Sequence, residues 1–106
     1  MISFQDFKKL DIRVSEIKAV ENHPNADKLL VMQVKVGDEE RQLVAGLKGH
    51  YEPDELQGKK IVIVANLEPA VLRGEKSEGM LLAATDGDNI VIPTPECDVA
   101  SGSSVS

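Results

Sequence analysis

The chain has 106 residues, and its 12 lysines and arginines against 18 aspartates and glutamates give a formal net charge of −6. A chain of this length forms one domain whose core needs neither disulfides nor metal. The single cysteine, Cys97, excludes an internal disulfide, and the sequence shows no basic-then-apolar leader and no apolar stretch near the ~20 residues of a membrane span. We therefore expect a protein of the reducing cytoplasm.

Charge is distributed unevenly along the chain. Residues 1–76 contain all 12 basic residues and 13 acidic ones, whereas residues 77–106 contain five acidic residues and no basic one. The total charge argues against nucleic acid, whose phosphates attract basic surfaces. The nearly neutral first three quarters can still collect lysine and arginine on one face.

The first expected elements are a short helix and a bent strand. Ser3 followed by Asp6 resembles a capping box and predicts a helix over Phe4–Lys9. From Leu10 apolar and polar residues alternate, and the alternation changes phase near Ile17. A phase change inside a strand indicates a bulge, and small closed barrels use strands that bend in this way.

Further short strands follow along the chain. Apolar patterns predict them over residues 30–36, 43–47, 61–65, 80–84 and 90–92, and Pro53 predicts a helical turn between the third and fourth strands. The sequence Asp86-Gly87-Asp88 is typical of a hairpin turn. These elements indicate an all-β fold, best matched by the five-stranded oligonucleotide-binding (OB) barrel with short helices at the N-terminus and between strands 3 and 4. We expect the small, polar end over residues 100–106 to be mobile unless a partner pins it.

Neither a metal site nor a catalytic site is indicated. His23, His50, Cys97 and Asp98 do not have the spacing of zinc ligands, and the sequence after Asp86 begins like a calcium loop but lacks the remaining ligands. No glycine-rich phosphate loop, serine elbow or matched carboxylate pair is present. We therefore expect no cofactor, no metal and no enzymatic activity.

Two connections carry candidate binding residues. The long one, residues 66–80, has two cations, hydroxyl and amide donors, and glycines that permit close backbone approach to a ligand. Taken alone, either connection is also typical of a solvated loop. In an OB barrel, however, the loops between strands 1–2 and 4–5 lie at the same rim, which predicts one shared site. The candidate residues are Asn25, Lys28, Asn66, Arg73, Lys76 and Ser77.

Two longer segments, Asp11–Leu47 and Asn66–Ala84, resemble the tRNA-binding domain family. The most specific stretches are His-Pro-Asn-Ala-Asp-Lys-Leu, beginning at His23, and Leu-Arg-Gly…Ser…Gly-Met, beginning at Leu72. The family includes the C-terminal domain of many methionyl-tRNA synthetases, stand-alone tRNA-binding proteins and the cytokine-like domain of a multisynthetase auxiliary protein. The resemblance extends from Phe4 to about Val99.

This resemblance implies a non-catalytic module that holds the outer corner of tRNA by shape and supplies tRNA to an aminoacyl-tRNA synthetase, above all the methionyl enzyme. It also implies homodimerisation through the terminal segments, so we expect one domain over residues 1–106 in which residues 93–106 form an extension that contributes to the dimer. For Met80, the tRNA contact that the resemblance assigns has an alternative, in which Met80 is the first core residue of its strand. By position, the resemblance assigns tRNA contacts to Asn25, Lys28, Asn66, Arg73, Ser77 and Met80.

Two alternatives remain open. Val71, where family members often have lysine, together with Glu68 and the acidic last quarter, favours a dimerising interaction module with a weak RNA site. A small secretion chaperone that binds peptides shares the fold and part of the pattern. The sequence also leaves open which tRNA is preferred and whether the chain is complete or part of a synthetase.

Overall fold

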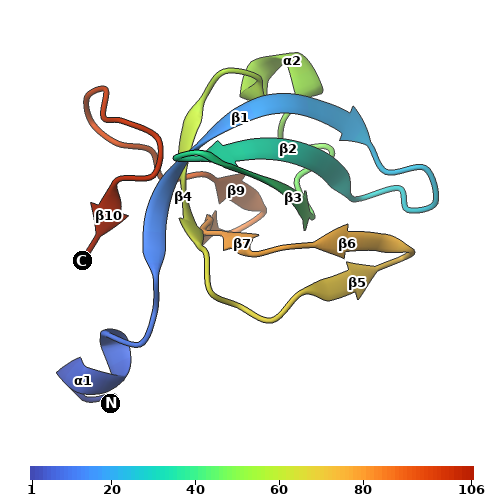
Figure 1. Cartoon of the computed structure of the whole chain (residues 1–106). Helices are drawn as coiled ribbons and strands as arrows, with labels where there is room; N and C mark the ends of the chain where they lie inside the picture. Colours follow the sequence, from blue (N-terminus) through green and yellow to red (C-terminus); the bar gives the residue numbers. More distant parts are fainter.

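The computed structural model describes residues 1–106 and shows a strongly curled antiparallel sheet with two short helices (Figure 1). The predicted all-β, OB-type fold is confirmed, with one helix at the N-terminus and the other between β3 and β4. Neither helix has the length or the apolar character needed to cross a membrane. In chain order the elements are α1 (Phe4–Phe7), β1 (Ile12–Asn22), β2 (Leu30–Val36), β3 (Glu39–Ala45), α2 (Pro53–Leu56), β4 (Lys60–Val64), β5 (Ala70–Leu72), β6 (Glu75–Ser77), β7 (Met80–Leu81), β8 (Ala84–Asp86), β9 (Asn89–Val91) and β10 (Ser104–Val105).

The long strand β1 belongs to both sides of the barrel. It pairs with β4 over Ile12–Glu16 and with β2 over Glu16–Asn22. Its register shifts between Ile17 and Ala19, which confirms the bulge expected from the phase change. The bulge lets one strand bend around the core, and the strand order becomes β3-β2-β1-β4-β7.

The core fills the inside of this curl. Alternate residues of β2 point inward, because side chains of a strand alternate between its two faces. Leu56 of α2 is fully buried at one end of the barrel. The other core residues are Ile17, Leu30, Met32, Val34, Val36, Leu43, Ala45, Leu47, Ile61, Ile63, Ala65, Leu81 and Ile92.

The barrel closes between β3 and the segment that joins β6 to β7. The Glu78 amide donates to the Gln42 carbonyl oxygen at 2.7 Å. The Val44 amide donates instead to the side-chain oxygen of Ser77, at 3.1 Å. A side-chain hydroxyl therefore accepts one of the hydrogen bonds that close the barrel, where a regular sheet would use a backbone carbonyl.

The C-terminal segment is pinned to β1, contrary to the expected mobile end. The Gly102 amide donates to the Val14 carbonyl, and the Val14 amide donates to the Ser103 carbonyl, before β10 pairs with the first residues of β1. The Ser101 hydroxyl bridges the Lys35 carbonyl and the Gly37 amide. Small residues allow this contact, because a Cβ on Gly102 would lie 2.9 Å from Gly37 backbone atoms. Composition pointed to disorder, but long-range backbone pairing overrides it.

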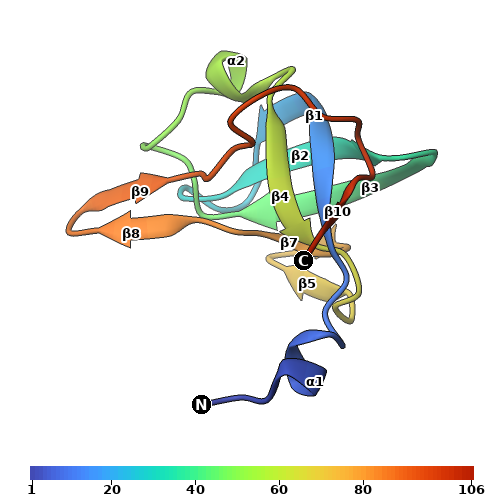
Figure 2. The same ribbon diagram turned by 90° about the vertical axis from the view of Figure 1, so that its left-hand side faces the viewer.

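The connection expected over residues 66–80 contains a two-stranded hairpin, β5–β6, that the sequence did not predict. The remaining differences concern the ends of elements, and β3 begins at Glu39 instead of residue 43. Helix α1 ends at Phe7, and the next two residues form a turn. The strand expected over residues 80–84 divides, since β7 ends at Leu81 and Ala84 begins a separate hairpin, β8–β9. That hairpin projects from the barrel (Figure 2).

Candidate nucleic-acid interface

The β1–β2 loop and the β5–β6 hairpin extend on the same side of the barrel (Figure 1). One hydrogen bond joins them: His23 Nε2 lies 2.9 Å from the carbonyl oxygen of Leu72. His23 is buried, with 5% of its surface exposed. The structure therefore brings together the two loops that the sequence assigned to one rim.

A third segment lies beside the first loop. The backbone amide of Lys48, in the connection that leaves β3, donates to the carbonyl oxygen of Lys28 at 3.4 Å. Residues 23–29, 46–48 and 72–76 thus form one continuous surface, which we call the loop rim.

The tip of the β5–β6 hairpin has a constrained backbone. Arg73 has φ = 55° and Gly74 has φ = 92°, so both central residues of the turn are left-handed. Two left-handed residues match the twist of a two-residue hairpin, but this conformation is uncommon for a residue other than glycine, asparagine or aspartate. Arg73 is exposed. Its strained backbone places a cation at the tip of the β5–β6 hairpin, and such strain often accompanies function.

Cations at the loop rim lack carboxylate partners. Elsewhere, five cations each lie within 3.4 Å of an aspartate or glutamate oxygen, namely Lys9, Arg13, Lys18, Arg41 and Lys60, whereas Lys8, Lys35 and Lys59 make no ion pair and lie apart from one another in the sequence. A cation that is paired with a carboxylate is less available to bind a phosphate. The rim cations, which are exposed and make no ion pair, are Lys28, Lys48, Arg73 and Lys76.

Asn25 and Lys28 lie on the loop rim with exposed side chains. The Asn25 backbone amide donates to His23 Nδ1 at 2.9 Å, whereas its side-chain amide makes no hydrogen bond within the chain. Together with Arg73, these two residues are the predicted contacts that the structure leaves free to meet a ligand.

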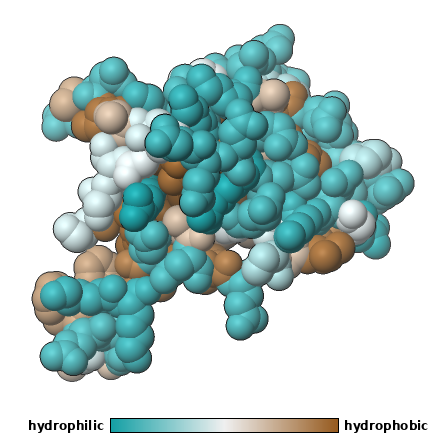
Figure 3. Space-filling model, viewed as in Figure 1, coloured by the Kyte–Doolittle hydropathy of each residue, from teal (hydrophilic) through white to brown (hydrophobic).

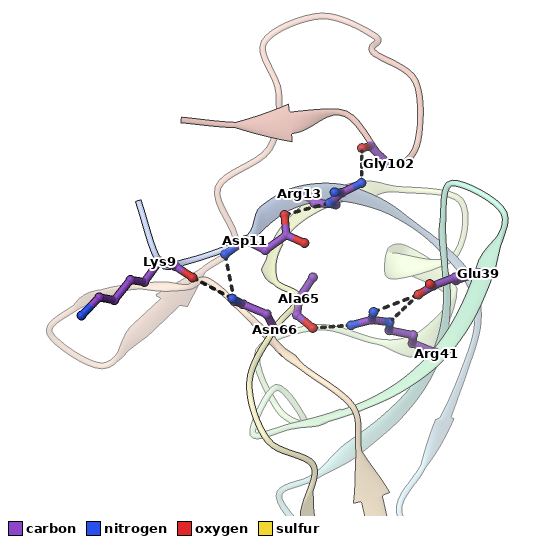
Figure 4. Close-up of polar contacts among 8 residues, drawn as sticks. All are labelled: Lys9, Asp11, Arg13, Glu39, Arg41, Ala65, Asn66 and Gly102. Carbon is purple, nitrogen blue, oxygen red and sulfur yellow. Dashed lines mark hydrogen bonds and ion pairs between the residues drawn. The ribbon is translucent and has the colours of Figure 1, made fainter. Parts of the chain in front are cut away.

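Asn66 lies away from the loop rim, and both ends of its amide are occupied (Figure 4). Its Oδ1 accepts from the Asp11 amide at 2.8 Å, and its Nδ2 donates to the Lys9 carbonyl at 2.7 Å. Asn66 thereby ties the segment after α1 to the chain leaving β4.

Ser77 and Met80 also serve the interior. Ser77 is 2% exposed, and its hydroxyl donates to the Gly79 carbonyl while accepting from the Val44 amide. Met80 is partly buried against the core and pairs with Val64. These two residues hold β6 and β7 against the barrel, and neither offers a free polar group to the loop rim.

Figure 4 shows a different arrangement at the opposite side, where Arg13 and Arg41 point to partners within the chain. Arg13 Nε donates to Asp11 at 2.8 Å, and this hydrogen bond, followed by the charge of the same carboxylate, raises the pKa of Arg13. Arg41 contacts Glu39 and donates to the Ala65 carbonyl. Both guanidinium groups are therefore occupied by partners within the chain.

Two residues of the loop rim were not among the sequence candidates. Lys48 belongs to no motif, and only the tertiary contact with Lys28 reveals it. His23 begins the motif of the first loop, but the sequence assigns it no contact. Its bond to the Asn25 amide is local, but its other partner, Leu72, is 49 residues away in the sequence, so no local pattern predicts that contact.

Residues 12–104 match the family model described as "Putative tRNA binding domain". The chain is 54% identical over 104 residues to a methionine–tRNA ligase of Pyrococcus horikoshii, covering 98% of this chain and 14% of the relative. The chain thus spans only a small part of the curated relatives it matches.

Two solved structures are similar over the whole chain. A MetRS-related protein from Pyrococcus horikoshii has 32% identity and a TM-score of 0.94, with 100% of this chain and 98% of that chain covered. The CsaA chaperone protein from Picrophilus torridus has 33% identity and a TM-score of 0.93, with both chains fully covered.

Proposed function

The chain belongs to the tRNA-binding domain family, and from this premise we propose that it is a non-catalytic module that presents tRNA to an aminoacyl-tRNA ligase, above all the methionyl enzyme, in the cytoplasm. The observation that carries this proposal is the loop rim, where hydrogen bonds join three segments whose cations have no carboxylate partner. Arg73 and Lys28 would bind phosphate oxygens, and Asn25 would donate its side-chain amide. Asn66, Ser77 and Met80 would act indirectly, by holding the hairpin and the neighbouring chain in place.

The aromatic residues favour recognition of folded RNA. Binders of single strands stack bases on aromatic side chains, each worth about 1–3 kcal/mol. Here Phe4 and Phe7 lie on α1, and the hydroxyl of Tyr51 accepts from the Ile92 amide. The strands of the barrel therefore present no stacking platform. A surface of exposed cations instead suits the phosphates and 2′-hydroxyls of a structured tRNA, read by shape.

A weak tRNA site is sufficient for this role. When a binding module is linked to an enzyme, in one chain or through an assembly, the second contact becomes intramolecular and benefits from a high effective concentration. The relatives named as methionine–tRNA ligases are about seven times longer than this chain, since it covers 14% of their length. The domain would raise the local concentration of tRNA and leave the reaction to the catalytic part.

Titration of labelled tRNA at low and moderate salt tests the proposal. Arg73→Ala should weaken binding about 10- to 100-fold, as expected for a lost charged hydrogen bond, and should lower the slope of log K against log salt by about one. All tRNAs should be affected about equally. Lys35→Ala is the matched control, because it removes the same charge from an exposed lysine at the far end of β2. Absence of salt-sensitive binding by the wild type would overturn the proposal.

We also propose that the chain forms a homodimer through α1 and the C-terminal extension, residues 93–106. Apolar atoms are visible in the region of α1 (Figure 3), where Phe4 is 69% exposed and Leu10 is 42% exposed. A groove of about 500 Å³ runs between this segment and Val105 of β10. A second copy would cover these side chains, because exposed apolar patches commonly mark protein contacts.

Sedimentation over a range of concentrations tests the dimer. Phe4→Ser should shift the equilibrium toward monomer. Val91→Ser, which alters a half-exposed apolar residue of β9, should not. A wild-type protein that stays monomeric at high concentration would refute the dimer and leave the tRNA proposal standing.

A second candidate function is peptide binding. Val71 on β5 is 70% exposed and pairs with Lys76, so an apolar residue lies beside the cations of the loop rim. The similar fold of the CsaA chaperone protein supports this candidate. Val71→Lys distinguishes the two functions: it should strengthen tRNA binding if the rim binds RNA, and weaken suppression of client aggregation if the rim binds peptides.

A further inference from the structure

We propose that His23 is a positioning residue that holds the hairpin carrying Arg73 against the loop carrying Asn25 and Lys28, so that one tRNA meets all three side chains at once. This inference rests on the proposed tRNA-binding function and adds a residue that itself need not touch RNA. Its imidazole lies between the two loops and is 5% exposed.

The two partners of the imidazole define its protonation. The Asn25 backbone amide lies 2.9 Å from Nδ1, and a backbone amide only donates, so Nδ1 must accept. The Leu72 carbonyl oxygen lies 2.9 Å from Nε2, and a carbonyl only accepts, so Nε2 must carry the proton. Both bonds are satisfied together in the neutral ring with its proton on Nε2. His23 thus has one defined orientation and one bond to each loop.

Each bond ends next to a proposed contact. Leu72 immediately precedes Arg73, whose left-handed backbone sets the direction of its side chain. Asn25 is itself a proposed contact and lies three residues before Lys28. A two-stranded hairpin with three residues in each strand is marginally stable alone, so its tip needs an external attachment. Ser77 and Gln42 attach the β6 strand of the hairpin to β3, and His23 attaches the end of the β5 strand to the β1–β2 loop.

Two conservative substitutions separate the two bonds. The amide nitrogen of glutamine reaches the position of Nε2, so His23→Gln can still donate to the Leu72 carbonyl. The amide of asparagine reaches only the position of Nδ1, so His23→Asn can still accept from the Asn25 amide but cannot reach the hairpin. The two variants lack the same ring, and they differ in whether the loops remain connected.

The test is tRNA titration with wild type and both variants, together with thermal unfolding and amide hydrogen exchange of the free proteins. His23→Asn should weaken binding about five- to tenfold, with a shallower salt dependence and faster exchange at residues 72–76, whereas His23→Gln should bind within about twofold of wild type. The two variants should unfold at similar temperatures, which excludes a general loss of structure.

Three outcomes would overturn the inference. If His23→Asn binds as tightly as wild type, the connection does not matter for tRNA. If His23→Gln loses as much affinity as His23→Asn, the ring acts only by packing. If the wild type shows no salt-sensitive tRNA binding, the proposed function fails and this inference fails with it. The first two outcomes, with normal binding by the wild type, overturn only the role of His23, so the two kinds of failure are distinguishable.

Discussion

The loop rim and the terminal end of the barrel, formed by α1, β10 and residues 98–103, handle charge in opposite ways. At the terminal end, Lys9, Arg13 and Lys60 each face a carboxylate, and backbone pairing fastens the last residues to β1. At the loop rim the cations are unpaired, and the segments are joined by the bond from His23 to the Leu72 carbonyl and by the bond from the Lys48 amide to the Lys28 carbonyl. Four of the seven cations without a carboxylate partner lie at the loop rim, so the clustering of unpaired cations distinguishes this surface. Net charge, which is −6 for the whole chain, does not reveal it.

The largest effect on stability should come from adding a side chain where Gly102 lies against Gly37 at the terminal end. Gly102→Ala would place a methyl group 2.9 Å from Gly37 backbone atoms at φ = +91°, and should lower the free energy of unfolding by about 2–4 kcal/mol. Gly58→Ala is the matched control, with φ = +87° and no atom within 4 Å. It should cost only the backbone strain, about 1 kcal/mol. Chemical denaturation measures both, and equal losses would show that the steric contact is unimportant.

At the base of the hairpin that carries the loop rim, Ser77→Ala should have the next largest effect on stability. It leaves the buried Val44 amide without an acceptor, at a cost of about 1–3 kcal/mol, and loosens the hairpin, so tRNA affinity should fall as well. Ser104→Ala makes the same chemical change at an exposed residue of the terminal end and should alter stability by less than ~0.5 kcal/mol. Denaturation and tRNA titration together check this. Unchanged stability of Ser77→Ala would argue against its closing role.

A smaller, purely electrostatic effect is expected at Lys48. If the loop rim includes the connection after β3, Lys48→Ala should weaken tRNA binding about three- to tenfold and lower the salt slope, with stability unchanged. The measurement is titration at several salt concentrations beside Lys35→Ala. Identical behaviour of the two variants would limit the rim to the β1–β2 loop and the hairpin.

The smallest effect should come from Ser15, inside the barrel between the two ends. Its hydroxyl is buried and has no hydrogen-bond partner. Because a buried unsatisfied hydroxyl is unfavourable, Ser15→Ala should leave the unfolding free energy unchanged or raise it by up to ~1 kcal/mol. Binding of tRNA should not change. A clear loss of stability would mean that the hydroxyl has a partner in solution.

The sequence predicted the barrel well because its strands carry local signals. Alternation identified β2, the phase change near Ile17 identified the bulge in β1, and Pro53 identified α2. The structure of the C-terminal end was harder to predict from the sequence. Nothing local in residues 100–106 indicates that Gly102 fits against Gly37, because that contact depends on a turn 65 residues away.

The candidate site was predicted in part. The sequence identified both loops, and the structure places Asn25, Lys28 and Arg73 on the loop rim with exposed side chains. It gives Asn66 and Ser77 internal partners instead, because an amide or a hydroxyl serves a backbone group as readily as a phosphate. Residue type shows what a side chain can bond to, and only tertiary contacts show what it does bond to.

The directions of the two termini have a consequence for how this domain can be joined to other proteins. In Figure 1 both chain ends lie on the side opposite the β1–β2 loop and the tip of the β5–β6 hairpin. A polypeptide attached at either end therefore leaves the molecule facing away from those loops. The same barrel can be carried as a terminal appendage, or as a fusion partner in the laboratory, while its loops stay open to solvent.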